Sequence, residues 1–156
     1  MANDEHKETL EGEVNHIIRE SRMVLPGIQA LFGFQMIAVF NPQFSHALPL
    51  PGQLLHVGAT ALIVCAIALI MAPAAYHRLA EPDRISRHFA NYASAMVSVA
   101  MVPLAIALAI ELSLICYVLL RSFWVATALG GGLGLLLSSL WFVYPELRSR
   151  RLKTRT

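Results

Sequence analysis

The chain has 156 residues, of which 56% are hydrophobic and 14% are charged, and its formal net charge is +2. Soluble domains contain about 45–50% apolar and about 25% charged residues, and the apolar excess here lies in four long runs separated by short polar segments. This pattern excludes a disordered chain, a nucleic-acid-binding module and an ordinary cytosolic enzyme. It predicts a small membrane protein with no nucleic-acid partner.

Each of the four apolar runs is long enough to be a membrane-spanning helix. A helix needs about 20 apolar residues to cross a hydrocarbon core about 30 Å thick. Glu111 is the only Asp, Glu, Lys or Arg within the four runs, which are residues 23–40, 53–76, 92–120 and 123–144. The connections between them favour an up-down-up-down bundle. The predicted fold is therefore an all-α, integral membrane four-helix bundle over residues 23–144.

Lys and Arg residues are unevenly distributed between the connections. The N-terminal segment 1–22 and the middle loop hold three each and the tail 145–156 holds five, whereas residues 41–52 hold none and the last connection has only Arg121. Positive charge accumulates on the cytoplasmic side of a membrane protein. Both termini and the middle loop are therefore predicted to be cytoplasmic, with the basic tail lying against anionic lipids.

The N-terminal segment contains an apolar stripe on an otherwise charged helix, formed by Leu10, Val14, Ile17 and Ile18. Such a pattern predicts an amphipathic helix. It fits a short helix lying on the cytoplasmic leaflet. It fits equally a helix that runs straight into the first span, because Pro26 is tolerated near a helix start or a kink.

Four polar side chains, one from each predicted span, are expected at a similar depth in the outer half of the membrane. This depth follows from the helical rise of about 1.5 Å per residue, and the four are Gln35, His56, Glu111 and Thr127. A buried carboxyl group disfavours its charge and an adjacent imidazole can share its proton, so a proton or cation site is one interpretation. A second is a polar cluster that orients the helices. A third places Glu111 simply near the outer interface.

The fourth run has a small residue at every fourth position, namely Ala126, Gly130, Gly134 and Ser138. A ladder of small residues lets another helix approach closely. The partner is either the third span of the same chain or a second copy. Because four spans bury little surface, we also expect the protein to form a homo-oligomer.

A polar patch is predicted at the cytoplasmic face, made by residues at and near the cytoplasmic ends of the first two spans: Glu20, Arg22, Gln29, Tyr76, His77 and Arg78. A salt bridge to the middle loop is the plain explanation for its charges. His77 and His88 bracket that loop and are the histidines considered for haem or metal binding. Without further ligands nearby, the sequence predicts no cofactor and no metal.

Two segments together resemble a family of small bacterial four-span membrane proteins catalogued as a domain of unknown function. One is Glu20-x-Arg22 followed by Pro26-Gly27-x-Gln29-x-Leu31-x-x-Phe34, and the other is Ala72-Pro73-x-x-Tyr76-His77-Arg78. The resemblance covers mainly the first ninety residues. It implies a bacterial inner-membrane location and a four-helix layout, and it implies no activity.

No motif predicts an enzyme, because the chain has no H-E-x-x-H, no G-x-S-x-G and no clustered carboxylates. Two functions remain. One is a subunit of an oligomeric proton or cation pathway that uses the intramembrane polar layer. The alternative is a structural or accessory membrane protein that binds lipid or partner subunits without transport.

Overall fold

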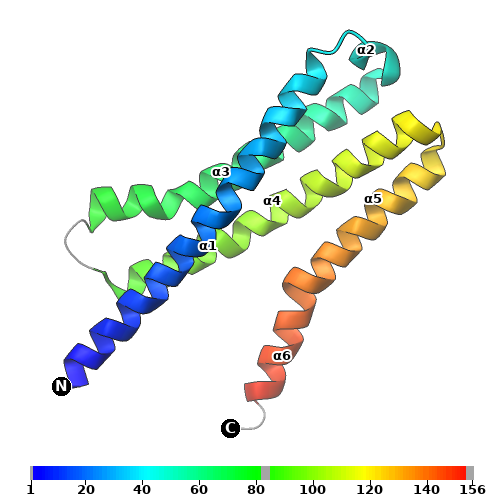
Figure 1. The fold of residues 1–156 in the computed structure, drawn as a ribbon. Helices are drawn as coiled ribbons and strands as arrows, with labels where there is room; N and C mark the ends of the chain where they lie inside the picture. The colour runs from blue at the N-terminus through cyan, green and yellow to red at the C-terminus, as the bar shows by residue number, and fades with distance from the viewer. Residues whose placement is uncertain (1, 82–84, 154–156) are drawn as a thin grey trace. The chain divides into compact units, whose positions relative to one another are not determined.

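The computed structural model describes the backbone of residues 2–81 and 85–153, and every regular element in these ranges is helical, as Figure 1 traces. The all-α prediction is therefore confirmed for the described residues. The elements are α1 (Ala2–Val39), α2 (Phe44–Ala47), α3 (Leu50–Ala80), α4 (Arg87–Leu120), α5 (Phe123–Ser138), a π-helical segment η1 (Ser139–Val143) and α6 (Tyr144–Lys153).

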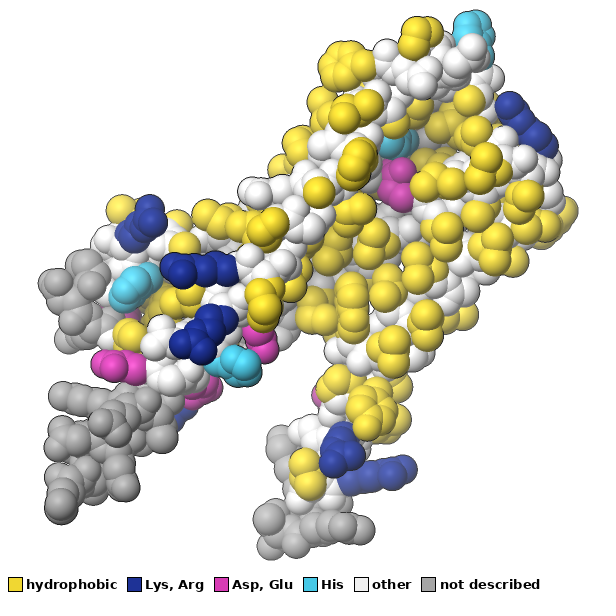
Figure 2. All heavy atoms as spheres, viewed as in Figure 1, with side chains coloured by type: hydrophobic (Ala, Val, Ile, Leu, Met, Phe, Trp, Pro, Cys, Tyr) yellow, Lys and Arg dark blue, Asp and Glu magenta, His cyan; other side chains and the backbone are white. Residues whose placement is uncertain are grey.

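Four helical stretches are long and apolar enough to cross a membrane, and they match the four predicted runs, with Phe40 of the first run just outside its helix: Leu10–Val39, Leu50–Ala80, Arg87–Leu120 and Phe123–Leu152. The first of them begins well before residue 23. Hydrophobic side chains cover much of the face shown in Figure 2, and many large ones are exposed. Soluble monomers rarely expose a contiguous apolar patch larger than a few hundred Å². This surface suits lipid, and the chain is a multi-pass membrane protein.

The amphipathic N-terminal segment is the beginning of α1, which continues without interruption past Pro26 to Val39. The structure thus has the second of the two arrangements that the sequence allowed. A proline early in a helix removes few intrahelical hydrogen bonds, because the first N–H groups have no partner in any helix. Pro26, by contrast, lies well inside α1, so this helix forms despite the loss of the one backbone hydrogen bond that proline cannot donate.

Two helices extend beyond the ends predicted for them. The second run was expected to end near Pro73 and Tyr76, but α3 continues to Ala80, since spanning helices tolerate an internal proline. The segment from residue 145 was predicted as a basic tail, and its described part continues the helix through η1 into α6. An ion pair one turn apart, from Arg150 Nε to Glu146 Oε1 at 3.0 Å, supports α6.

The chain divides into two compact units, and each is described by itself. Unit 1 comprises Met1–Ile37 and Ile63–Pro103, and unit 2 comprises Ala38–Leu62 and Leu104–Thr156.

Unit 1 contains an apolar cluster between the start of α1 and the start of α4. Its buried members are Leu10, Val14, Phe89, Ala90 and Ala93, with Ile17, Tyr76 and Ile85 packed against them. The ring of Phe89 stacks on Tyr76 with a centroid distance of 6.1 Å and an interplanar angle of 11°. The stripe predicted on the N-terminal helix therefore contacts protein in unit 1.

Two polar contacts support this cluster. The hydroxyl of Ser86 accepts a hydrogen bond from the Phe89 N–H at 3.0 Å, which satisfies a free donor at the start of α4. Arg87 Nη1 lies 2.8 Å from Glu13 Oε2, with both side chains about half exposed. This ion pair joins α1 to Arg87, a residue counted with the middle loop, and its acidic partner Glu13 lies outside the predicted polar patch.

Unit 2 brings α5 against α4 through the predicted ladder of small residues. Ala126 and Gly130 are buried. A Cβ atom at Gly130 would lie 2.5 Å from the carbonyl oxygen of Ala109 and closer still to the hydroxyl of Ser113, so only glycine permits this approach. At Gly134 the corresponding distance to the Ala109 Cβ is 3.4 Å, and Ser138 is exposed. The ladder faces the third span of the same chain, and the contact loosens toward Ser138.

Candidate functional site

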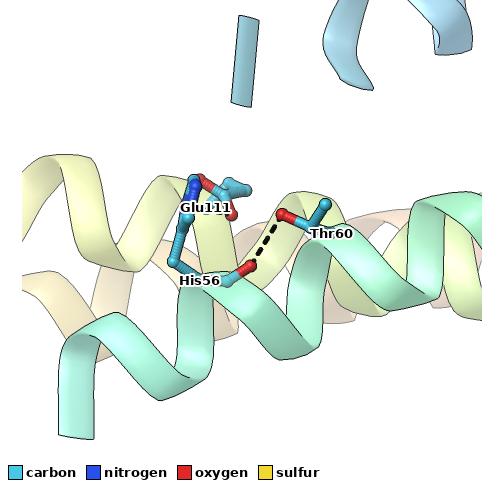
Figure 3. A network of polar contacts seen from close by, with 3 residues as sticks. All are labelled: His56, Thr60 and Glu111. Carbon is cyan, nitrogen blue, oxygen red and sulfur yellow. Dashed lines mark hydrogen bonds and ion pairs between the residues drawn. The ribbon is translucent and has the colours of Figure 1, made fainter. Parts of the chain in front are cut away.

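A histidine and a glutamate from two different spans meet in unit 2. His56 lies in α3 and Glu111 lies in α4. The His56 Nδ1 is 3.0 Å from Oε1 and 3.3 Å from Oε2 of Glu111. The side chain of His56 is 5% exposed and that of Glu111 is 18% exposed. Figure 3 shows the imidazole directed at the carboxyl group, so the two titratable side chains form a direct contact within apolar helices.

Neighbouring residues hold the imidazole in place. The backbone carbonyl of His56 accepts a hydrogen bond from the Thr60 hydroxyl one turn later, at 2.9 Å (Figure 3). The ring of Phe44, in the short helix α2, meets the His56 ring edge-on, with a centroid distance of 5.1 Å and an interplanar angle of 60°. The edge of one ring facing the plane of another is a favourable aromatic geometry.

The connection that carries Phe44 is itself tied to the spans of unit 2. Gln53 Nε2 donates to the Leu48 carbonyl at 2.9 Å. Arg121 Nη1 donates to the Ala47 carbonyl at 3.3 Å. Arg121 has a φ of 53°, the left-handed conformation that ends α4 before the short turn into α5. These bonds hold α2 over the site, so the aromatic ring against His56 is part of a positioned element.

A cavity of about 290 Å³ adjoins the pair. Asn41 and Gln43 supply polar groups at its wall, and the other lining residues besides the pair are apolar: Ala38, Phe44, Ala47, Leu48, Leu114, Ile115 and Val118. The space has room for several water molecules. Glu111 therefore borders a cavity that extends to the polar residues of the segment joining α1 to α3.

The pair solves an electrostatic problem in an apolar span. A lone carboxylate in hydrocarbon is costly, whereas an imidazolium–carboxylate pair, or its neutral form with the proton moved to the carboxyl group, has no net charge. Both forms place one proton between Nδ1 and the carboxyl oxygens. A proton shared within the pair can therefore lie on either side chain with little rearrangement of heavy atoms.

Thr127, another member of the predicted polar layer, does not line the cavity of the pair. Thr127 is exposed and lines a separate cavity of about 320 Å³ in unit 2, together with Ser113 and Tyr117. Gln35 is buried, at 7% exposure, and belongs to unit 1. The layer was estimated from distance along each helix, which says nothing about the direction of a side chain around the helix axis. The structure brings His56 and Glu111 together and places Thr127 away from their cavity.

Three residues of the predicted cytoplasmic patch line a cavity of about 330 Å³ in unit 1, namely Arg22, His77 and Arg78. The other three do not line it: Tyr76 stacks on Phe89, Gln29 is exposed, and Glu20 lies 3.7 Å from His16 one turn earlier.

The histidines beside the middle loop contact aromatic rings. His77 lies 5.1 Å from the ring centroid of Phe89, and His88 lies 6.3 Å from that of Tyr76. Among the residues that the structure describes, no group of three or more His, Cys, Asp or Glu side chains is arranged to hold a metal.

Two aromatic residues were missed in the sequence analysis, Phe44 beside His56 and Phe89 at the centre of the unit 1 cluster. Phe89 had a signal, since Phe89, Ala90 and Ala93 repeat at helical spacing just before the third run and match the unpartnered stripe on the N-terminal helix. Phe44 had none, because it lies in a proline-rich connection.

Comparison with known proteins supports the assignment of the whole membrane region. No curated protein and no solved structure matches the chain. A family model described as a family of unknown function matches residues 3–145, which include all four spans and both residues of the pair. The match extends beyond the two segments that carried the resemblance. The chain therefore belongs to DUF6328, a family of unknown function.

Proposed function

We propose that the protein provides an intramembrane proton site at His56 and Glu111 and takes part in proton or cation movement across the bacterial inner membrane. The observation that carries this proposal is the 3.0 Å contact between the two side chains beside a cavity of about 290 Å³. Ionisable residues within spans are costly and commonly mark ion pathways or proton relays. No enzymatic step is part of the proposal.

The proposed orientation places both termini and the middle loop in the cytoplasm, in an up-down-up-down arrangement of the spans. Eleven of the twelve Lys and Arg residues fall in segments assigned to that side, and Arg121 falls on the other. In this orientation the connection that carries Asn41 and Gln43 faces outward. The cavity of the pair is then approached from the outer surface.

Transport requires a route past the pair, and a single copy with four spans offers little room for one. We therefore propose that copies associate. Large apolar side chains remain exposed on α1 and α5. In the most apolar stretch of each of their spans only 11% of the residues are buried, against 28% and 33% for the spans of α3 and α4. These two spans have the most surface to offer to another copy or to lipid.

The second candidate function is an accessory membrane protein without transport. It is favoured by the contact itself, since a polar contact between a histidine and a glutamate also orients helices. In that case the pair contributes to packing alone and the cavity is not part of a route.

The test is proton flux into proteoliposomes under an imposed membrane potential, read from a pH-sensitive dye in the lumen. The variants are Glu111→Gln and His56→Asn, each compared with the wild type. The matched control is His46→Asn, because His46 is an exposed histidine in α2 of the same unit and does not line the cavity.

We expect wild-type flux above that of empty liposomes, reduced at least about tenfold by either variant of the pair and unchanged by the control. Absence of wild-type flux, or equal flux in Glu111→Gln, would reject transport through this site. A folded but inactive wild type would leave the accessory function.

A further inference from the structure

The cavity of about 330 Å³ in unit 1 has an unbalanced charge. Of the described residues that line it, three are basic or can become so, Arg22, His77 and Arg78, and none is acidic. Within the described parts of the chain, neither Arg22 nor Arg78 forms an ion pair. The Nδ1 of His77 is buried and has no hydrogen-bond partner among the described residues. The cavity therefore offers donors that nothing in the described structure uses.

Apart from Ser21, the rest of the cavity wall is apolar, and it follows the polar end in a definite order. Leu25 lies about one helical turn from Arg22 toward the span of α1, and Ile70 and Met71 lie about two turns from Arg78 toward the span of α3. Pro73 and Phe89 also belong to the apolar part. In both helices the cationic residue lies at the end of the apolar run and the aliphatic residues lie deeper, which is the layout of an amphiphile at a membrane interface.

We propose that this cavity binds the headgroup phosphate of an anionic phospholipid, with the first segment of an acyl chain against Leu25, Ile70 and Met71. Guanidinium groups bind phosphate through charge-assisted, frequently bidentate hydrogen bonds. The volume is at the low end of the range of about 300–1,000 Å³ for small-molecule sites, so it holds a headgroup and the start of a chain rather than a whole lipid. A phosphate ion alone would leave the aliphatic wall without a partner.

The site differs from the interaction expected for the basic tail. That interaction is a diffuse attraction between exposed charges and a negatively charged surface. The cavity places two guanidinium groups, an imidazole and an aliphatic wall around one volume, so it binds one lipid molecule and discriminates between headgroups. It lies in unit 1 and does not depend on the proposed proton site in unit 2.

The test uses the purified full-length protein in detergent, with dioctanoyl phosphatidic acid as the probe and native mass spectrometry to count lipids retained per chain. The charge variant is Arg22→Gln/Arg78→Gln. Its control is Arg19→Gln/Arg148→Gln, which removes the same charge from two exposed positions that do not line the cavity. The volume variant is Ala74→Trp, which fills the cavity and keeps both arginines, and its control is Ala75→Trp at the next, exposed position outside the lining.

We expect one retained lipid in the wild type and in both controls. We expect retention to fall at least about tenfold in the charge variant and in the volume variant, the loss that follows from removing one or two charge-assisted contacts. Circular dichroism and gel filtration of each variant establish that it is folded. If the charge variant does not fold, the comparison of Ala74→Trp with Ala75→Trp decides the question alone.

Three results would overturn the proposal. Equal retention by the folded charge variant and its control would show that the arginines do not bind the lipid. Equal retention by Ala74→Trp and Ala75→Trp would place the lipid elsewhere. Displacement of the lipid by inorganic phosphate at the same concentration would show a site for a small anion rather than a lipid.

Discussion

The two units each contain a cavity beside a histidine, and they treat charge in opposite ways. In unit 2, the imidazole of His56 faces an acidic side chain, Glu111, at 3.0 Å. In unit 1, His77 shares its cavity with two arginines and no acidic residue among the described lining. A neutral pair tolerates a position deep in a span. An uncompensated cationic group belongs near water or headgroups, and Arg22 and Arg78 do lie at the ends of apolar runs.

The units also differ in what holds their helices together. Unit 1 relies on an apolar cluster around Phe89, outside the most apolar part of the spans. Unit 2 relies on a polar pair and on the close approach of α5 to α4 at Gly130. Burial stabilises the cluster of unit 1 because it removes apolar surface from water. Within lipid that driving force is absent, and close packing and polar contacts replace it.

The largest expected effect on stability comes from truncating Phe89, which is only 2% exposed. We expect Phe89→Ala to lower the free energy of unfolding by about 4 kcal/mol, because it leaves a cavity in a packed cluster. Phe34→Ala is the control, since Phe34 is 71% exposed and its truncation should cost less than about 0.5 kcal/mol. The measurement is denaturant-induced unfolding in detergent. Equal losses in the two variants would contradict the idea that this cluster stabilises unit 1.

The second effect concerns the pair in unit 2. We expect Glu111→Leu to cost about 3 kcal/mol, because it leaves the buried imidazole without its partner. The double variant His56→Leu/Glu111→Leu should recover most of that loss, since it removes both polar groups from the apolar surroundings. Unfolding of the wild type, the two single variants and the double variant measures the coupling free energy between the two side chains directly. Additive losses would mean that the 3.0 Å contact contributes nothing to stability.

Much of this arrangement could be predicted from the sequence because lipid makes strong demands on composition. Long apolar runs with Glu111 as their single charge located all four spans, and counting along the helices placed His56 and Glu111 at one depth. The same counting put Thr127 beside them, whereas it is exposed on another cavity. Depth depends on the number of residues alone, but the direction of a side chain depends on helix rotation, which no single sequence supplies.

The contacts of the N-terminal stripe were less predictable for a different reason. Leu10, Val14 and Ile17 required an apolar surface, and lipid and protein satisfy that requirement equally well by composition. The structure covers the stripe with Phe89 and its neighbours in unit 1. In a membrane protein, an amphipathic pattern therefore predicts a helix with more certainty than it predicts the partner of its apolar face.

A third, smaller effect separates close approach from simple burial in unit 2. We expect Gly130→Ala to cost about 1–2 kcal/mol, because the new Cβ would lie 2.5 Å from the Ala109 carbonyl oxygen and the helices must move apart. Gly131→Ala is the matched control, since a Cβ there meets nothing within 4 Å. Thermal unfolding in detergent compares the two. A loss in the control that equals the loss at Gly130 would point to backbone flexibility rather than to helix contact.

The smallest effect concerns the ion pair between Arg87 and Glu13, whose side chains are 52% and 47% exposed. A double-mutant cycle with Arg87→Gln and Glu13→Gln should give a coupling of about 0.5 kcal/mol, the usual value for an exposed pair. The coupling should shrink further at about 1 M salt, where the screening length falls to about 3 Å. The loss at Phe89 should persist under the same conditions, because burial is not screened. A coupling above about 2 kcal/mol that survives high salt would mean that charge, rather than burial, holds the start of α1 to α4, and the contrast drawn between the two units would then fail at its simplest point.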